Sequence, residues 1–314
     1  MDPVLKAALL SWGWRADVIV LLAVAGTLYS MGWRRLRRRI RQRPGALPSG
    51  RWQLSSAWRL TAYLSGLLLT GIALMSPLDT LGAALFTFHM IQHLLLIMIA
   101  PPLLMVANPM PFMLWGLPAP WRRKVGRALT RLLNSKAPFR RNLRKVTTPG
   151  IIWMAWVVSL LGWHDPNAYN AALRHELVHD VEHLTFFLAG MLFWWHVTGA
   201  GPRIHKRFGP IGRIAFLLSA IPPNMLIGVA IAFAREPIYT YYLDAPRLWG
   251  LTVMMDQQLG GVIMWVPGSM MYIIAALVLA ARLLEGDDQK PALPEQEWGM
   301  DEALLAPGLE DRSN

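Results

Sequence analysis

Residues 174–196, RHELVHDVEHLTFFLAGMLFWWH, join a histidine-rich start to a long apolar continuation. A helix needs about 20 largely apolar residues to cross a bilayer core about 30 Å thick, and this stretch has nearly that length. His175, His179 and His183 recur at four-residue steps, so they would share one face of a helix. Ionisable side chains inside a membrane span are costly, and the first interpretation of them is functional. The stretch therefore predicts a membrane helix with a polar site near its start.

The rest of the chain has the composition of an integral membrane protein. Of its 314 residues, 54% are hydrophobic and only 16% are charged. We predict an all-α integral membrane protein, a bundle of seven transmembrane helices over residues 16–284, preceded by an N-terminal arm at 1–15. Residues 285–314 are acidic and poor in aliphatic side chains, so we expect a disordered tail. The seven predicted spans are 16–33, 58–75, 83–107, 149–163, 177–198, 210–234 and 253–281.

The distribution of lysine and arginine predicts the orientation of this bundle. Short cytoplasmic loops collect these residues, and here they gather in segments 34–51 and 122–145. We therefore place the N-terminus outside and the C-terminus in the cytoplasm. The net charge of +12 is then a property of the topology and does not indicate nucleic acid binding. Segment 118–146 has apolar residues at helical spacing among its cations, which predicts a helix lying on the lipid surface.

Histidine pairs point to a metal. The chain has no cysteine, which excludes disulfides and thiolate ligands, so any metal must use histidine, methionine or carboxylates. His89 and His93 form one pair at four-residue spacing, and His179 and His183 form another, with Glu182 close to the same side. Histidines can also serve as hydrogen-bonding contacts between helices. Two pairs at matching depth favour a metal, and imidazole suits both copper and zinc.

Two other functions fit parts of the same pattern. HDVEH at 179–183 matches H-x-x-E-H, in which two histidines bind zinc and the glutamate acts as the base of a hydrolase. Histidines on facing helices can also hold haem b. The 17 methionines give copper a modest preference, because thioether sulfur favours Cu(I).

Four blocks of sequence resemble the polytopic CtaG family of cytochrome c oxidase assembly factors. They are SPLDTLGAALFTFHMIQHLLLIMIAPPLLMVANP at 76–109, WHDPNAYNAAL at 163–173, EHLTFFLAGMLFWW at 182–195 and DQQLGGVIMWVPGSMMY at 256–272. The resemblance implies a seven-helix protein of the bacterial inner membrane that helps to mature haem-copper oxidase, handling copper at the outer face. Its partners would be oxidase subunits and the lipid bilayer, with a periplasmic copper donor as a further candidate.

We therefore predict a copper chaperone rather than an enzyme, since transfer of the ion to the apo-oxidase by ligand exchange needs no covalent chemistry. Zinc and haem b are the alternative cofactors. The predicted metal ligands are His89, His93, His183, Glu182 and Asp256. The residues expected around them or at the mouth of the site are Asp79, Gln92, His164, His179 and Gln257.

Overall fold

The computed structural model describes residues 6–7, 10–41, 56–202, 204–205 and 208–284, and within these ranges it contains helices and no strand. The predicted tail at 285–314 lies outside the described residues. The helices are α2 Ala16–Arg41, α3 Ala57–Met75, α4 Pro77–Ala84, α5 Phe86–Leu94, α6 Ala100–Val106, α7 Pro109–Gly116, α8 Ala119–Leu133, α9 Pro138–Val146, α10 Pro149–Trp163, α11 Pro166–Arg174, α12 Glu176–Thr198, α13 Pro210–Leu218, α14 Ile221–Ala232 and α15 Val253–Leu284, with a π-helical turn η1 at Leu95–Ile99 and a 3-10 turn η2 at Thr240–Leu243.

Five helical segments are long and apolar enough to cross a membrane. They are Ala16–Ile40, Ala57–Met75, Phe86–Val106, Pro210–Ala232 and Val253–Leu284. A sixth is reached if α9 and α10, which meet at an angle of 53°, count as one broken span. The predicted fifth span coincides with α12, which is helical over 23 residues. Its histidines and acids lower its hydropathy below that of the other segments, so a seventh crossing stays a prediction.

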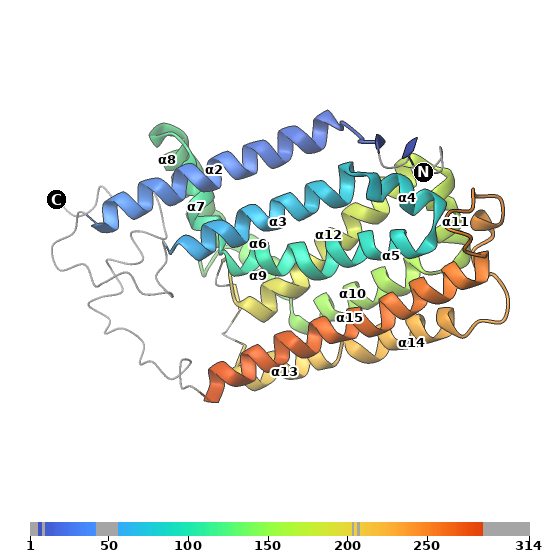
Figure 1. Cartoon of the computed structure of the whole chain (residues 1–314). Helices are drawn as coiled ribbons and strands as arrows, with labels where there is room; N and C mark the ends of the chain where they lie inside the picture. The colour runs from blue at the N-terminus through green and yellow to red at the C-terminus, as the bar shows by residue number, and fades with distance from the viewer. Residues whose placement is uncertain (1–5, 8–9, 42–55, 203, 206–207, 285–314) are drawn as a thin grey trace, which may run out of the picture.

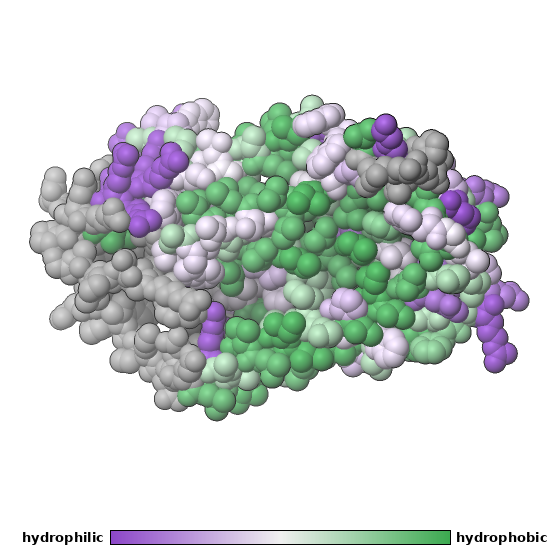
Figure 2. Space-filling model, viewed as in Figure 1, coloured by the Kyte–Doolittle hydropathy of each residue, from purple (hydrophilic) through white to green (hydrophobic). Residues whose placement is uncertain are grey.

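The middle of the bundle exposes apolar side chains. Figure 2 shows hydrophobic side chains over the middle of one face and hydrophilic ones toward both ends. Large apolar side chains such as Leu68, Leu226 and Leu277 are more than half exposed. An exposed apolar surface of this extent marks contact with lipid or another protein. The helices lie roughly along the long dimension of the molecule (Figure 1).

Small residues let two of the helices approach each other closely. At Gly32 on α2, a Cβ atom would lie 1.7 Å from the carbonyl oxygen of Phe112 on α7. At Gly116 on α7, a Cβ atom would lie 2.0 Å from the carbonyl oxygen of Leu28. Packing of backbone against backbone through glycine is typical of membrane helices.

The helical segment that runs from α5 through η1 to α6 is irregular near Pro101 and Pro102. Pro101 has no N–H group, so the carbonyl of Ile97 loses its helical partner. The indole nitrogen of Trp194 on α12 donates to this carbonyl over 3.2 Å instead. The π-helical turn η1 lies at the same place, and such turns are frequent at functional sites. This contact fixes α12 beside the irregular helix that carries His89 and His93.

The two ends of the bundle are formed by different short helices. Segment 118–146 forms two helices, α8 with Trp121 and Leu132 exposed and α9 after it, and its place on the lipid surface stays a prediction. Helix α8 lies near the end where α2 finishes, whereas α4 and α11 lie at the opposite end (Figure 1). The side chain of Ser76 caps α4 by accepting from the backbone N–H of Leu78. The predicted site residues lie toward the end of the bundle that holds α4 and α11.

Candidate metal centre

Side chains from α5 and α12 meet at this end of the bundle. His89, His179, Glu182 and His183 each offer one ligand atom, and these atoms all lie within 4.8 Å of one another. We call these four residues the donor cluster. His179, Glu182 and His183 share a face of α12 because they are three and four residues apart. His89 comes from the first turn of α5.

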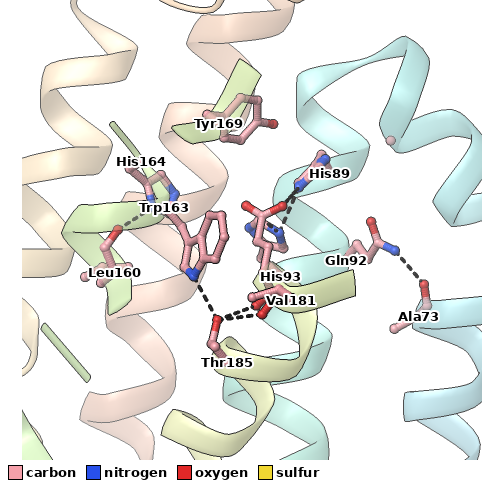
Figure 3. Close-up of polar contacts among 12 residues, drawn as sticks. Ala73, His89, Gln92, His93, Leu160, Trp163, His164, Tyr169, Val181 and Thr185 are labelled. Carbon is pink, nitrogen blue, oxygen red and sulfur yellow. Dashed lines mark hydrogen bonds and ion pairs between the residues drawn. The ribbon is translucent and has the colours of Figure 1, made fainter. Parts of the chain in front are cut away.

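The imidazoles and the carboxylate stand at distances suited to one ion. Nε2 of His89 lies 3.7 Å from one oxygen of Glu182, and Nε2 of His93 lies 3.6 Å from the other. Two ligands at the usual 2.0–2.1 Å from a tetrahedral metal are separated by about 3.4 Å. His93 is also within 2.8 Å of His89 through the two Nε2 atoms (Figure 3), so one of these nitrogens donates to the other. Those two atoms therefore cannot both bind the ion in this arrangement.

The donor atoms are buried and lack hydrogen-bond partners. His89 and Glu182 are fully buried, and His183 is 5% exposed. No partner is present within the described residues for His89 Nδ1, His179 Nε2, His183 Nε2 or either oxygen of Glu182. A buried polar atom without a partner costs about 1–3 kcal/mol, and a charged one costs more. A bound cation would give partners to the unpaired atoms that face it, so the residues present fit a metal ion.

Buried tyrosine rings pack beside the donor cluster. The ring of Tyr169 lies 5.1 Å from that of His89, and its hydroxyl lies 3.1 Å from that of Tyr242. The hydroxyl of Tyr242 donates to the carbonyl of Gly82 over 2.8 Å, so Tyr169 is the donor between the two tyrosines. Burial raises the pKa of Tyr242, which keeps this hydroxyl protonated. The sequence alone did not indicate Tyr169 as part of the site.

Asp256 has a different role from the one predicted. Its two carboxylate oxygens accept hydrogen bonds from the backbone N–H groups of Phe86 and Thr87, over 2.8 and 2.9 Å. The hydroxyl of Thr87 donates back to the carbonyl of Asp256 over 3.1 Å. Asp256 therefore caps the start of α5 from α15 and does not join the donor cluster. It positions His89 through the helix that it caps.

Three other predicted residues tie neighbouring segments together. The amide nitrogen of Gln92 donates to Asp79 and to the carbonyl of Ala73, over 2.8 Å in each case, which joins α3, α4 and α5. The amide oxygen of Gln257 accepts from the backbone N–H of Ile238 over 2.7 Å, which anchors the loop before η2. These contacts support the site without supplying ligand atoms.

The remaining histidines of this end divide between the site and its surroundings. His179, which was predicted only to surround the metal, belongs to the donor cluster. His175 stands exposed between α11 and α12 and is not in the cluster. His164 lies at the end of α10, with its ring 6.3 Å from that of His93. Burial lowers the pKa of His164 to about 4, so this ring is neutral near pH 7.

A charged contact holds the start of α12. Arg15 forms ion pairs with Asp17 and with Asp180, and the pairing raises the pKa of Arg15. Asp180 thus faces the N-terminal segment, while its neighbours His179 and Glu182 face the donor cluster. The alternation follows from helical spacing, because adjacent residues on a helix point in different directions.

Comparison with known proteins identifies relatives of this chain. The family model described as cytochrome c oxidase caa3 assembly factor matches residues 27–285. An uncharacterized protein of Mycobacterium bovis is 26% identical over 262 residues, which cover 80% of this chain and 36% of that protein. An uncharacterized protein of Mycobacterium leprae is 25% identical over 289 residues, which cover 87% of this chain and 40% of that protein. The chain thus spans well under half the length of these relatives. No solved structure matches it.

Proposed function

Because this chain belongs to the family of cytochrome c oxidase caa3 assembly factors, we propose that it binds a copper ion in the donor cluster and passes it to the apo-oxidase. The observation that carries the proposal is the convergence of buried ligand atoms without hydrogen-bond partners from α5 and α12. A cluster that served only to join helices would have its nitrogens paired.

The ligand set supports copper or zinc, and the family supports copper. Three imidazoles and one carboxylate are borderline ligands that suit either ion. A factor that assembles a haem-copper oxidase has copper as a plausible cargo. The chain has no cysteine that would favour a structural zinc site. We therefore assign copper to the donor cluster. Zinc found there instead of copper would change the assignment of the metal.

The alternatives from the sequence fit the geometry less well. In a zinc hydrolase the glutamate of H-x-x-E-H stays off the metal and acts on a bound water. Here both oxygens of Glu182 lie within 3.6 to 3.7 Å of histidine nitrogens and are buried, as ligand atoms would be. For haem, the cavity beside His93 measures about 30 Å³, far below the roughly 300 Å³ or more of small-molecule pockets.

The position of the cluster suits exchange of an ion with an outer partner. The ligands lie in the first two turns of α5 and α12, at the end of the bundle opposite the arginine-rich α8 (Figure 1). In the predicted orientation this end faces the periplasm, where we place the copper donor and the oxidase subunit that receives copper. Neutral imidazoles hold and release an ion without any covalent step.

Metal analysis of the purified protein tests the proposal. We expect about one copper ion in the donor cluster of the full chain in detergent, and its loss in His183→Ala. The matched control is His205→Ala, which removes a histidine at the other end of the bundle and should keep the copper. Equal copper in both variants would overturn the assignment. Zinc in place of copper, or a Soret band, would favour one of the two alternatives.

A cellular assay tests the role in assembly. In bacteria lacking their own copy of the protein, the intact chain should restore the activity of the copper-containing oxidase. Glu182→Gln should reach the membrane in the same amount and fail to restore that activity. Full restoration by this variant would show that assembly does not depend on the donor cluster.

A further inference from the structure

A second group of metal-binding side chains lies deeper in the bundle, beside the donor cluster. The lining of a cavity of about 30 Å³ includes two histidines and three methionines, namely His93, His164, Met90, Met98 and Met264, among otherwise mainly apolar side chains. A space of this size holds one water molecule or one ion. The three methionines are at most 5% exposed, and they come from α5, η1 and α15. No carboxylate lines this cavity.

Both histidines have a ring nitrogen without a hydrogen-bond partner. His164 Nδ1 lies 2.8 Å from the carbonyl of Leu160, which can only accept, so Nδ1 carries the proton. In a neutral ring Nε2 then presents a lone pair, and this atom is buried and unpaired. His93 Nδ1 is likewise buried and unpaired, while its Nε2 contacts His89 over 2.8 Å. His93 thus lies between the donor cluster and the cavity.

The chemistry of this lining selects a soft cation. Thioether sulfur favours Cu(I), whereas Zn²⁺ is bound by thiolate, imidazole and carboxylate and has no use for a thioether. Methionine also fills gaps in apolar cores, but core packing leaves the two unpaired imidazole nitrogens unexplained. We infer that this cavity is a second metal site, specific for Cu(I), formed by His93, His164 and the methionine sulfurs around them.

The inference goes beyond the proposed function, because it concerns a separate ion with different ligands. The donor cluster has a carboxylate and three imidazoles, whereas the inner cavity has neutral donors only. The two sites should therefore differ in their choice of metal. The donor cluster would accept Cu(I), Cu(II) or Zn²⁺, and the cavity would accept Cu(I) alone. His93 would link the two sites when an ion moves between them.

Anaerobic titration of the full-length protein with Cu(I), against a chromogenic Cu(I) chelator, tests this inference. The intact chain should bind two Cu(I) ions, and X-ray absorption at the copper edge should show sulfur neighbours. Replacing Met90, Met98 and Met264 together by leucine conserves volume and should reduce the stoichiometry to one, with loss of the sulfur signal. His164→Phe should also reduce it to one. Zn²⁺ should bind once in all of these variants.

The matched control removes the other site. His179→Ala should also lower the stoichiometry from two to one, but the remaining copper should keep its sulfur neighbours. If the leucine variant and His164→Phe bind two Cu(I) ions with an unchanged spectrum, the second site is wrong, and the proposed function is unaffected. If His179→Ala and His183→Ala keep both ions, the proposed function fails instead. Gel filtration of each variant establishes that it is folded.

Discussion

Histidines lie close together at both ends of the bundle, and the two groups differ in what their ring nitrogens contact. At the end opposite the donor cluster, the rings of His196 and His205 are 5.4 Å apart, and we call them the distal pair. Nε2 of His196 donates to the carbonyl of Thr147 over 2.9 Å, and Nε2 of His205 lies 2.8 Å from the hydroxyl of Thr147. That hydroxyl already donates to Leu143, so His205 donates to it.

This difference separates a structural contact from a candidate metal site. The distal pair uses its Nε2 protons to join α12, and the loop between α12 and α13, to Thr147. No carboxylate stands within salt-bridge distance of either ring in the described residues. The donor cluster instead directs unpaired atoms and a buried carboxylate at one point. Proximity of histidines is thus insufficient, because a metal requires lone pairs that no other group uses.

The largest expected effect is the loss of copper when a ligand is removed. His183→Ala should weaken copper binding by more than about 100-fold, since even removal of a residue that only supports a ligand costs about 10–100-fold. The matched change in the distal pair, His196→Ala, should alter the affinity by less than about twofold. Competition titration with a copper chelator measures both. Similar losses in the two variants would erase the distinction between the two ends.

Glu182→Gln should change metal binding and stability in opposite directions. Its copper affinity should fall by about 10–100-fold because the ligand loses its charge. The metal-free protein should become more stable by about 1–3 kcal/mol, because a buried carboxylate without a hydrogen-bond partner is replaced by a neutral amide. Thermal unfolding without metal measures this gain. A lower melting temperature for the metal-free variant would mean that Glu182 has a structural partner even without copper.

The sequence predicted the features of the site that depend on local spacing better than those that depend on contacts between distant segments. His179 and His183 were expected to lie together with Glu182 because residues three and four apart are neighbours on a helix surface. The structure brings these side chains together. Five of the predicted spans coincide with helical segments long and apolar enough to cross a membrane, because length and hydropathy are local properties. Asp256 was assigned as a ligand because an acid beside a predicted metal is a plausible donor. Its actual partners are backbone groups 169 and 170 residues away, and no local pattern indicates a cap from another helix.

Irregular features were visible in the sequence only as breaks. Pro101 has no N–H group and so interrupts a helix, but neither the π-helical turn nor the indole of Trp194 that donates to the carbonyl of Ile97 can be inferred from spacing. Tyr169 was likewise not distinguished from other aromatic residues, because its contact with His89 depends on how α11 packs. The parts that the sequence left open are those that depend on contacts between helices.

Removal of the cap on α5 should have a smaller effect on copper binding than removal of His183 or Glu182. Asp256→Ala removes the acceptor for two backbone N–H groups, and loss of a cap costs about 0.5–2 kcal/mol. Asp256→Asn keeps one oxygen as an acceptor and should cost less. Copper affinity should fall only modestly in both, because the ligand atoms remain and only α5 is less firmly held. Unfolding in detergent and copper titration together test this order. A loss of copper as large as that of His183→Ala would return Asp256 to the ligands.

The smallest effect is expected from a change at Thr147, which the distal pair contacts. Thr147→Val removes the hydroxyl that contacts His205 and Leu143 but keeps the backbone carbonyl that His196 uses. Loss of hydrogen bonds of this kind should lower the free energy of unfolding by about 1 kcal/mol, with copper binding unchanged. The matched change at the other end, Thr185→Val, removes the hydroxyl that accepts from the indole of Trp163 over 2.8 Å and should cost a similar amount. A measurable loss of copper from Thr147→Val would show that the two ends of the bundle are coupled, because the change lies outside both metal sites.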